Sequence, residues 1–210
     1  TADGQSLQWD DLTTRLRAQT QAFSAVAATH PLAALRLLVE CGGTAALTYF
    51  LRCIPPPADI SKLTALDEIL DESVELIVGA VSPAALTQAR APTRFGGIGL
   101  RRITPLSPIA HFASLAQCIQ SLPLCAHLPR DLCLFPLIAH PSLFPFPQVT
   151  SLMSSVLGDG PYPKKIQKSL SLALDTAAFV LLHSSLPADE KARLISLTQH
   201  GSSLWLHLPK

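Results

Sequence analysis

The 210-residue chain contains no asparagine, so it has no acceptor site for N-linked glycans. Charged residues are scarce: they make up 15% of the chain, against roughly 25% in ordinary soluble domains. Apolar residues make up 48%, which excludes intrinsic disorder because a disordered chain needs low hydrophobicity and high net charge. These few charges cannot cover the surface of a free-standing domain. We therefore expect a partner protein, a nucleic acid or the rest of a longer chain to cover part of it.

The sequence has no signal peptide and no clean membrane span. The apolar run 132–147 is broken by prolines, and the stretch 31–54 carries Arg36, Glu40 and Arg52. A spanning helix needs about 20 apolar residues without such charges. The chain also opens without the charged-then-apolar pattern of a secretory signal. We expect no membrane partner.

The five cysteines are an odd number and follow no disulfide-framework spacing. They predict buried, reduced thiols in an intracellular, reducing compartment. Cys125, His127, Cys133 and His140 are metal-type ligands, but their spacing matches no common zinc module, and we expect plain packing there. The chain starts at Thr1, which suggests a processed product or a piece of a longer chain. Processing is compatible with an organelle such as the mitochondrion.

Apolar residues recur at helical spacing along most of the chain, and no stretch has a convincing strand pattern. The predicted fold class is mainly α: an irregular helical bundle with a proline-rich extended segment in the middle. The expected helices cover 9–28, 31–53 with a break at 41–43, 62–78, 83–90, 108–121, 149–157, 164–183 and 188–199.

Six prolines lie between residues 123 and 147, too many for a long helix or a central strand. This segment is also very apolar, which argues for packing against a surface over a solvated linker. It divides the chain into a helical domain (1–122), a proline-rich extended connector (123–147) and a C-terminal helical subdomain (148–210).

The acidic residues have structural explanations. Asp10 and Asp11 are the only adjacent aspartates, and at an expected helix start we interpret them as capping residues. The helix 62–78 is expected to bury Leu63, Leu66, Ile69, Leu70, Leu76 and Ile77. Its opposite, solvent face is expected to carry Asp67, Glu68, Asp71, Glu72 and Glu75.

Motifs for catalysis are missing from the sequence. There is no G-x-S-x-G elbow, no Walker loop, no H-E-x-x-H and no pair of acids placed for two-metal chemistry. The glycines Gly96, Gly97 and Gly99 follow an expected helix and not a strand, so we interpret them as a structural turn and not a phosphate cradle. We expect no enzyme activity, no catalytic residues, no cofactor and no bound metal.

Positive charge is concentrated in two places. Residues 76–130 contain no acid, yet they hold Arg90, Arg94, Arg101, Arg102 and Arg130, and a second cluster consists of Lys164, Lys165 and Lys168. Guanidinium groups suit phosphate oxygens, so these clusters predict salt-sensitive, sequence-independent contact with a nucleic acid. The predicted contact residues are Arg90, Arg94, Arg101, Arg102, Lys164, Lys165 and Lys168. The alternative is a solvated basic face without a partner, and whether the clusters share one face stays open.

Several segments form a recognisable series: 31–38 (PLAALRLL), 41–43 (CGG), 47–56 (LTYFLRCIPP), 91–101 (APTRFGGIGLR) and 201–209 (GSSLWLHLP). The series resembles the region that follows the catalytic palm of non-LTR retrotransposon reverse transcriptases, and 91–101 is similar to their LP-x-R-x-GGLGLR signature. Nothing corresponds to the family's aromatic-x-Asp-Asp palm motif. The resemblance therefore implies a thumb and post-thumb connector, which grips nucleic acid near Arg94, Arg101 and Arg102, and gives no support for polymerase activity.

The leading expectation is a non-catalytic RNA-binding or structural module derived from a retroelement reverse transcriptase. Its expected partners are RNA, contacted through the backbone, and other subunits of a large ribonucleoprotein such as a mitochondrial ribosome. One alternative is the thumb connector of an active RNA-directed DNA polymerase, which an intact palm upstream would favour. The other is a protein-interaction scaffold without RNA contact. The leading expectation requires the guanidinium groups beside the glycine turn to point outward.

Overall fold

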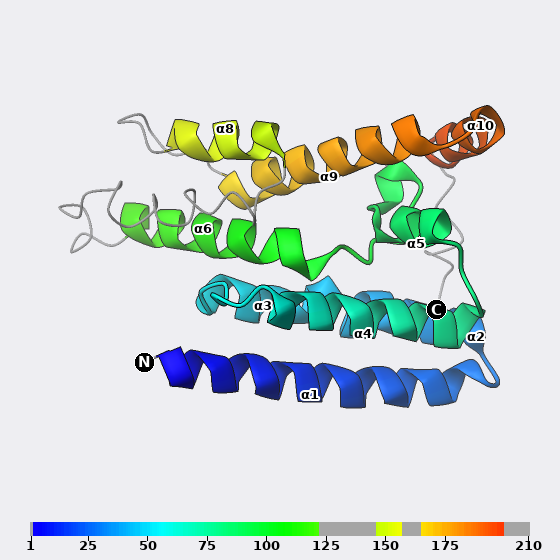
Figure 1. The fold of residues 1–210 in the computed structure, drawn as a ribbon, viewed down its shortest axis with the longest axis horizontal. Helices are drawn as coiled ribbons and strands as arrows, with labels where there is room; N and C mark the ends of the chain where they lie inside the picture. The colour runs from blue at the N-terminus through cyan, green and yellow to red at the C-terminus, as the bar shows by residue number, and fades with distance from the viewer. Residues whose placement is uncertain (1, 122–145, 157–164, 200–210) are drawn as a thin grey trace.

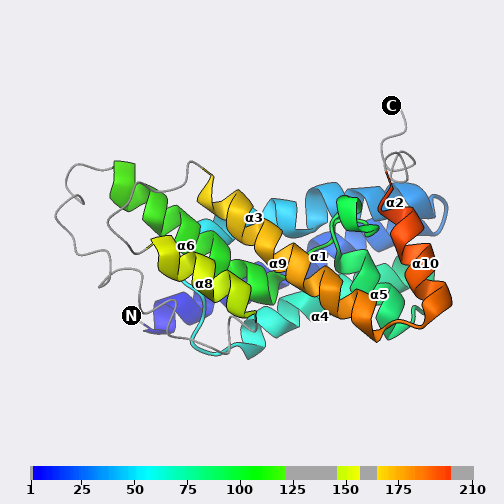
Figure 2. The ribbon, with the colours of Figure 1, turned by 90° about the horizontal axis from the view of Figure 1, so that it is seen from above.

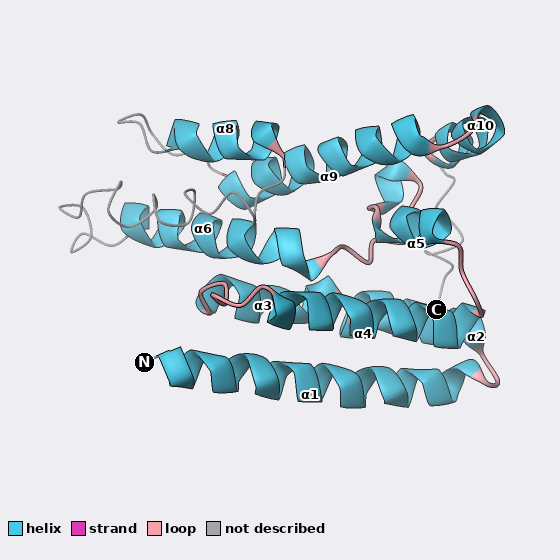
Figure 3. Ribbon diagram, viewed as in Figure 1, coloured by secondary structure: helices cyan, strands magenta, loops and turns pink. Residues whose placement is uncertain are grey.

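The computed structural model describes residues 2–121, 146–156 and 165–199. Every regular element in these ranges is a helix (Figure 3). The mainly α prediction is confirmed. Most of the predicted proline-rich connector lies outside the described residues. The elements are α1 (Ala2–Ala27), α2 (Pro31–Leu37), η1 (Leu38–Gly42), α3 (Thr44–Cys53), α4 (Ser61–Val78), α5 (Pro83–Arg90), η2 (Thr93–Phe95), α6 (Ile103–Ser121), α8 (Pro147–Val156), α9 (Ile166–Ser185) and α10 (Ala188–Leu197).

The helices lie in layers (Figure 1). Helix α1 forms one outer layer, and α2, η1 and α4 pack on it. Helix α6 packs on α3 and α4, and α9 packs on α6 and α8. Seen from above, α9 runs over α6 and ends beside α5 and α10 (Figure 2). Between α4 and α6 the chain passes through α5, η2 and the glycines.

The predicted break near residues 41–43 is confirmed. A π-helical turn, η1, ends at Gly42, and Gly43 separates it from α3. A side chain at Gly42 would overlap the ring of Phe23, which explains a glycine there. The whole stretch Pro31–Cys53 is long and apolar enough to cross a membrane by length and composition alone. Its Leu38, Leu47 and Leu51 belong to the hydrophobic core, as residues of a core helix do.

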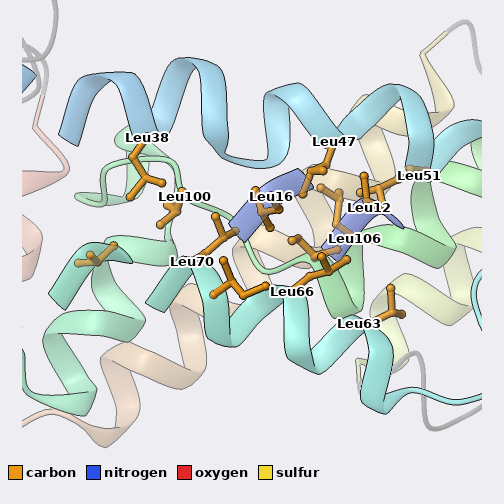
Figure 4. Packing of buried hydrophobic residues seen from close by; sticks show 14 of the residues in the cluster. Leu12, Leu16, Leu38, Leu47, Leu51, Leu63, Leu66, Leu70, Leu100 and Leu106 are labelled. Atoms are coloured by element: carbon orange, nitrogen blue, oxygen red, sulfur yellow. The ribbon is translucent and has the colours of Figure 1, made fainter. Parts of the chain in front are cut away.

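Two clusters make up most of the core. Leucines from α1, η1, α3, α4 and the start of α6 converge in the first (Figure 4), which also contains the buried Trp9. The second joins α6 to α8 and α9 through Ile109, Phe112, Met153 and Leu170. The second cluster therefore contains residues from both helical segments, 1–122 and 148–210. The division of the chain into domains stays a prediction.

Helix α4 differs from its prediction at two positions. Leu76, expected inside, is 67% exposed, and Asp67, expected in solvent, is buried. The buried stripe of α4 follows Leu63, Leu70 and Ile77, and Leu76 lies a helical step away from it. Asp67 falls within the stripe, so its burial follows from the same periodicity.

Helix α6 begins five residues before the predicted start, at Ile103, and Pro108 lies inside it. Its first turn is capped by a distant side chain: the Asp67 carboxylate accepts the backbone N–H groups of Ile103 at 2.7 Å and Thr104 at 3.1 Å. These N–H groups have no partner within their own helix. The local sequence does not contain the capping residue, which is why the start was misplaced.

Two smaller predictions are wrong. Helix α1 begins at Ala2, so Asp10 and Asp11 lie within it and pair with Lys62 and Arg15 instead of capping a helix start. The cysteines were expected to be buried, but Cys41, Cys53 and Cys118 are exposed free thiols. Cys125 and Cys133 lie outside the described residues.

Candidate nucleic-acid interface

The glycine turn between η2 and α6 needs glycine at three positions. Gly96 and Gly99 have φ angles of 78° and 88°, in the region that favours glycine. A Cβ atom at Gly97 would overlap the carbonyl oxygens of Ala91 and Gln88. These features agree with the structural turn predicted from the sequence. The turn places Arg94 before it and Arg101 after it.

Arg94 and Arg101 both bind Asp175 of α9. One terminal nitrogen of each guanidinium lies 2.7 Å from the same carboxylate oxygen, Oδ2. The Asp175 side chain is 5% exposed, whereas Arg94 and Arg101 are 43% and 31% exposed. Burial raises the pKa of the Asp175 carboxyl, and the charges of Arg101 and Arg94 oppose that rise. Each of the two arginines therefore binds a buried carboxylate while part of its side chain stays exposed to solvent.

An aromatic stack supports the same turn. Phe95 stacks on Phe179 of α9 with ring centroids 4.9 Å apart, and Phe179 stacks in turn on His183. The Arg94 guanidinium lies 5.0 Å from the centre of the Phe95 ring, within cation–π range. Asp175, Phe179 and His183 follow each other at four-residue intervals on α9, so one helix face holds the whole turn.

Arg90 does not face outward. Its side chain is 5% exposed and lies between α4 and the end of α5. Its guanidinium donates to the Asp67 carboxylate at 3.1 Å, to the Asp67 carbonyl at 2.7 Å and to Asp71 at 2.8 Å. The expectation of an outward-pointing guanidinium is therefore wrong for Arg90 and right only in part for Arg94 and Arg101, because buried carboxylates attract all three.

The remaining predicted contact residues that the structure describes are exposed. Arg102, Lys165 and Lys168 have no carboxylate partner among the described residues. Lys168 precedes Asp175 by seven residues, which places both on one side of α9 about 10 Å apart. Helix α9 therefore places Lys168 on the side that carries Asp175, the partner of Arg94 and Arg101. Lys164 lies outside the described residues.

Sequence reasoning missed Asp175, the residue that organises this surface. Its signal was present: it is the only acid between Asp159 and Asp189. An isolated acid in a largely apolar helix is a candidate for a buried ion pair, because an unpaired buried charge is costly. The sequence could not name its partners, which lie 74 and 81 positions away.

Within the described ranges, no group of three or more His, Cys, Asp or Glu side chains is placed to hold a metal ion. Residues Cys125, His127, Cys133 and His140 lie outside those ranges. No protein-family model, curated protein or solved structure matches the chain. The resemblance to reverse transcriptases therefore stays a prediction from the quoted motifs.

Proposed function

We propose that this chain is a non-catalytic, helical RNA-binding module, derived from a retroelement reverse transcriptase as its motifs imply. It contacts the RNA backbone as a subunit of a large ribonucleoprotein, for which a mitochondrial ribosome is one setting. The supporting observation is a local excess of positive charge. Arg94 and Arg101 bind one carboxylate between them, that of Asp175, and Arg102, Lys165 and Lys168 have no carboxylate partner among the described residues.

This excess contrasts with the environment of Arg90. There one guanidinium meets two carboxylates, those of Asp67 and Asp71, so its charge is fully compensated and enclosed. Arg90 therefore leaves the set of candidate contacts. The other cations remain accessible, and phosphate contacts need accessible charge but no particular base sequence.

The spacing of the cations suits a backbone ligand. Lys168 lies about 10 Å along α9 from Asp175, which holds Arg94 and Arg101. An extended strand can cross this distance within a few nucleotides. Asp175 compensates one of the five cations, which leaves four net positive charges for the strand, so the plot of log affinity against log salt concentration should fall with a slope of about −2.8.

The test is binding of a single-stranded oligouridylate of about 20 nucleotides across a salt series, with two triple variants of equal charge change. R102A/K165A/K168A removes three exposed cations of the proposed interface. R15A/R17A/R193A removes three exposed cations from α1 and α10. The first variant should bind at least about tenfold more weakly with a shallower salt slope, and the second should resemble the wild type. Equal losses in both variants would refute the interface.

A second candidate function, a protein-interaction scaffold, has its own supporting observation. Between Lys168 and Asp189, helix α9 and the turn after it carry one Asp, Glu, Lys or Arg, the buried Asp175. Leu172, Val180 and Leu181 are exposed on this helix. An uncharged exposed face is typical of a protein contact. Under this alternative, RNA crosslinks at Arg102 and Lys168 are absent from the native assembly and protein crosslinks are found along α9.

The third possibility, that the chain belongs to an active RNA-directed DNA polymerase, concerns residues outside this sequence. Reading the coding sequence upstream decides it, because an in-frame aromatic-x-Asp-Asp motif favours the enzyme. The RNA-binding measurement is valid in either case, since it concerns this module alone.

A further inference from the structure

The Asp175 carboxylate beside the glycine turn has two arginine partners, one more than its charge requires. Asp175 is neutralised by one guanidinium, yet Arg94 and Arg101 both bind it through the same oxygen. A purely internal ion pair needs only one of them. The second guanidinium leaves one uncompensated positive charge at a partly exposed position.

The geometry also holds the two guanidinium groups close together. Both bonded nitrogens lie 2.7 Å from Oδ2 of Asp175, so they are at most about 5.4 Å apart. Each guanidinium has five N–H donors, and each uses one of them on Asp175. No other hydrogen bond of either guanidinium is formed within the described part of the chain. Two adjacent sets of donors therefore remain for an outside ligand.

Both side chains are held in place before any ligand arrives. Arg94 is fixed by Asp175 and by the Phe95 ring beneath it. Arg101 is fixed by Asp175, and its backbone N–H donates to the carbonyl of Gly99, two residues earlier, at 3.0 Å. Ordering a free arginine on binding costs conformational entropy, so fixing two of them beforehand favours affinity.

We propose that Arg94 and Arg101 form a clamp for one RNA phosphodiester, and that Asp175 is the positioning residue that holds the clamp open toward solvent. The inference rests on the proposed RNA-binding function and names one subsite of it. A phosphodiester carries one negative charge, which matches the one uncompensated positive charge of the three side chains. Its unesterified oxygens accept hydrogen bonds, and arginine forks are suited to such oxygens.

Replacing Asp175 by Asn distinguishes the clamp from a simple charge effect, because the two predict opposite changes in RNA affinity. D175N raises the net charge by one, so general electrostatic attraction predicts tighter binding of the oligouridylate. The clamp predicts weaker binding, by about fivefold, because the guanidinium groups lose their anchor. Tighter or unchanged binding by a folded D175N variant overturns the clamp.

A second set of variants keeps the charge and changes only the donor geometry. R94K and R101K each keep a positive charge but lose the planar fork, and R17K is the matched control at an exposed arginine of α1 outside the proposed interface. R94K and R101K should weaken binding about threefold to tenfold, while R17K should leave it nearly unchanged. Circular dichroism confirms folding, and if D175N does not fold, the lysine variants decide. Equal effects of all three lysine variants overturn the clamp.

A direct readout uses the dinucleotide UpU, which carries a single phosphodiester. In spectra of the arginine Nε–H groups, UpU should shift the resonances of Arg94 and Arg101 and leave that of Arg90 in place. D175N should abolish those shifts. If the wild type binds the oligouridylate but UpU moves neither resonance, the clamp is wrong and the RNA-binding proposal stands. If the wild type does not bind the oligouridylate, both are wrong.

Discussion

The buried ion pair around Arg90 makes the strongest prediction about the fold itself. Asp67 has two tasks: it binds the Arg90 guanidinium and caps the first turn of α6 through the N–H groups of Ile103 and Thr104. D67A removes both at once. It leaves Arg90 with the Asp71 carboxylate and the backbone carbonyl of residue 67, and it leaves two backbone donors without an acceptor.

The magnitude follows from these contacts. Breaking a buried ion pair by removing one partner costs about 3–5 kcal/mol, because the other charge stays buried and less compensated. Loss of a helix cap costs about 1 kcal/mol in addition. D67A should therefore lower the free energy of unfolding by about 4–6 kcal/mol, a large share of the roughly 5–15 kcal/mol of a typical domain. R90A should cost less, about 3 kcal/mol, because α6 keeps its cap.

Urea denaturation followed by circular dichroism measures these values, and a double-mutant cycle isolates the coupling. D67A/R90A removes the pair together, so its cost should fall short of the sum of the single costs by about 2 kcal/mol. R15A, in the exposed pair with Asp11, is the control and should change stability by less than about 0.5 kcal/mol. A cost below about 1 kcal/mol for D67A would show that Asp67 does not connect α4 to α5 and α6 as described.

Further substitutions test the glycine turn and one half-buried histidine. G97A should destabilise the protein by about 3 kcal/mol in thermal or urea unfolding, because the new Cβ overlaps two carbonyl oxygens. G79A, at a positive φ with no atom nearby, should cost only about 1 kcal/mol, and equal costs would contradict the packing of Gly97. Burial lowers the pKa of His111, whose Nδ1 lies 3.3 Å from the Arg52 carbonyl oxygen. Below about pH 6.5 the unfolded state therefore binds a proton before the folded state does, and the free energy of unfolding falls as the pH drops. H111Q should reduce that fall between about pH 7.5 and 5.5, whereas H30Q, at an exposed histidine, should not.

Local patterns were sufficient to predict most of the helices. The helix 83–90 matches α5 in both bounds, since Ser82 accepts a hydrogen bond from Ala85 and Pro83 starts the helix. Helix α4 differs from its prediction by one residue, and Gly79 ends it as expected. Caps and glycine stops act within a few residues, which is why a single sequence is enough to predict them.

Charge was harder to interpret than periodicity. The window 76–130 contains no acid, and this local absence favoured arginines that face outward. Their carboxylate partners lie far away along the chain: Arg90 pairs with α4, and Arg94 pairs with Asp175, 81 positions later. Ion pairing depends on tertiary contacts, so a stretch free of acids says little about whether its cations are compensated.

The two arginine sites differ in a way that bears on function. At Arg90, one cation meets two carboxylates inside the protein, and nothing is left to bind a ligand. At Asp175, one carboxylate meets two partly exposed cations. To hold the glycine turn against α9, Asp175 needs only one of the two arginines, because the stack of Phe95 on Phe179 also holds the turn there. The surplus cation therefore needs another explanation, and a phosphate of the proposed RNA partner is the ligand that fits its charge and its donors.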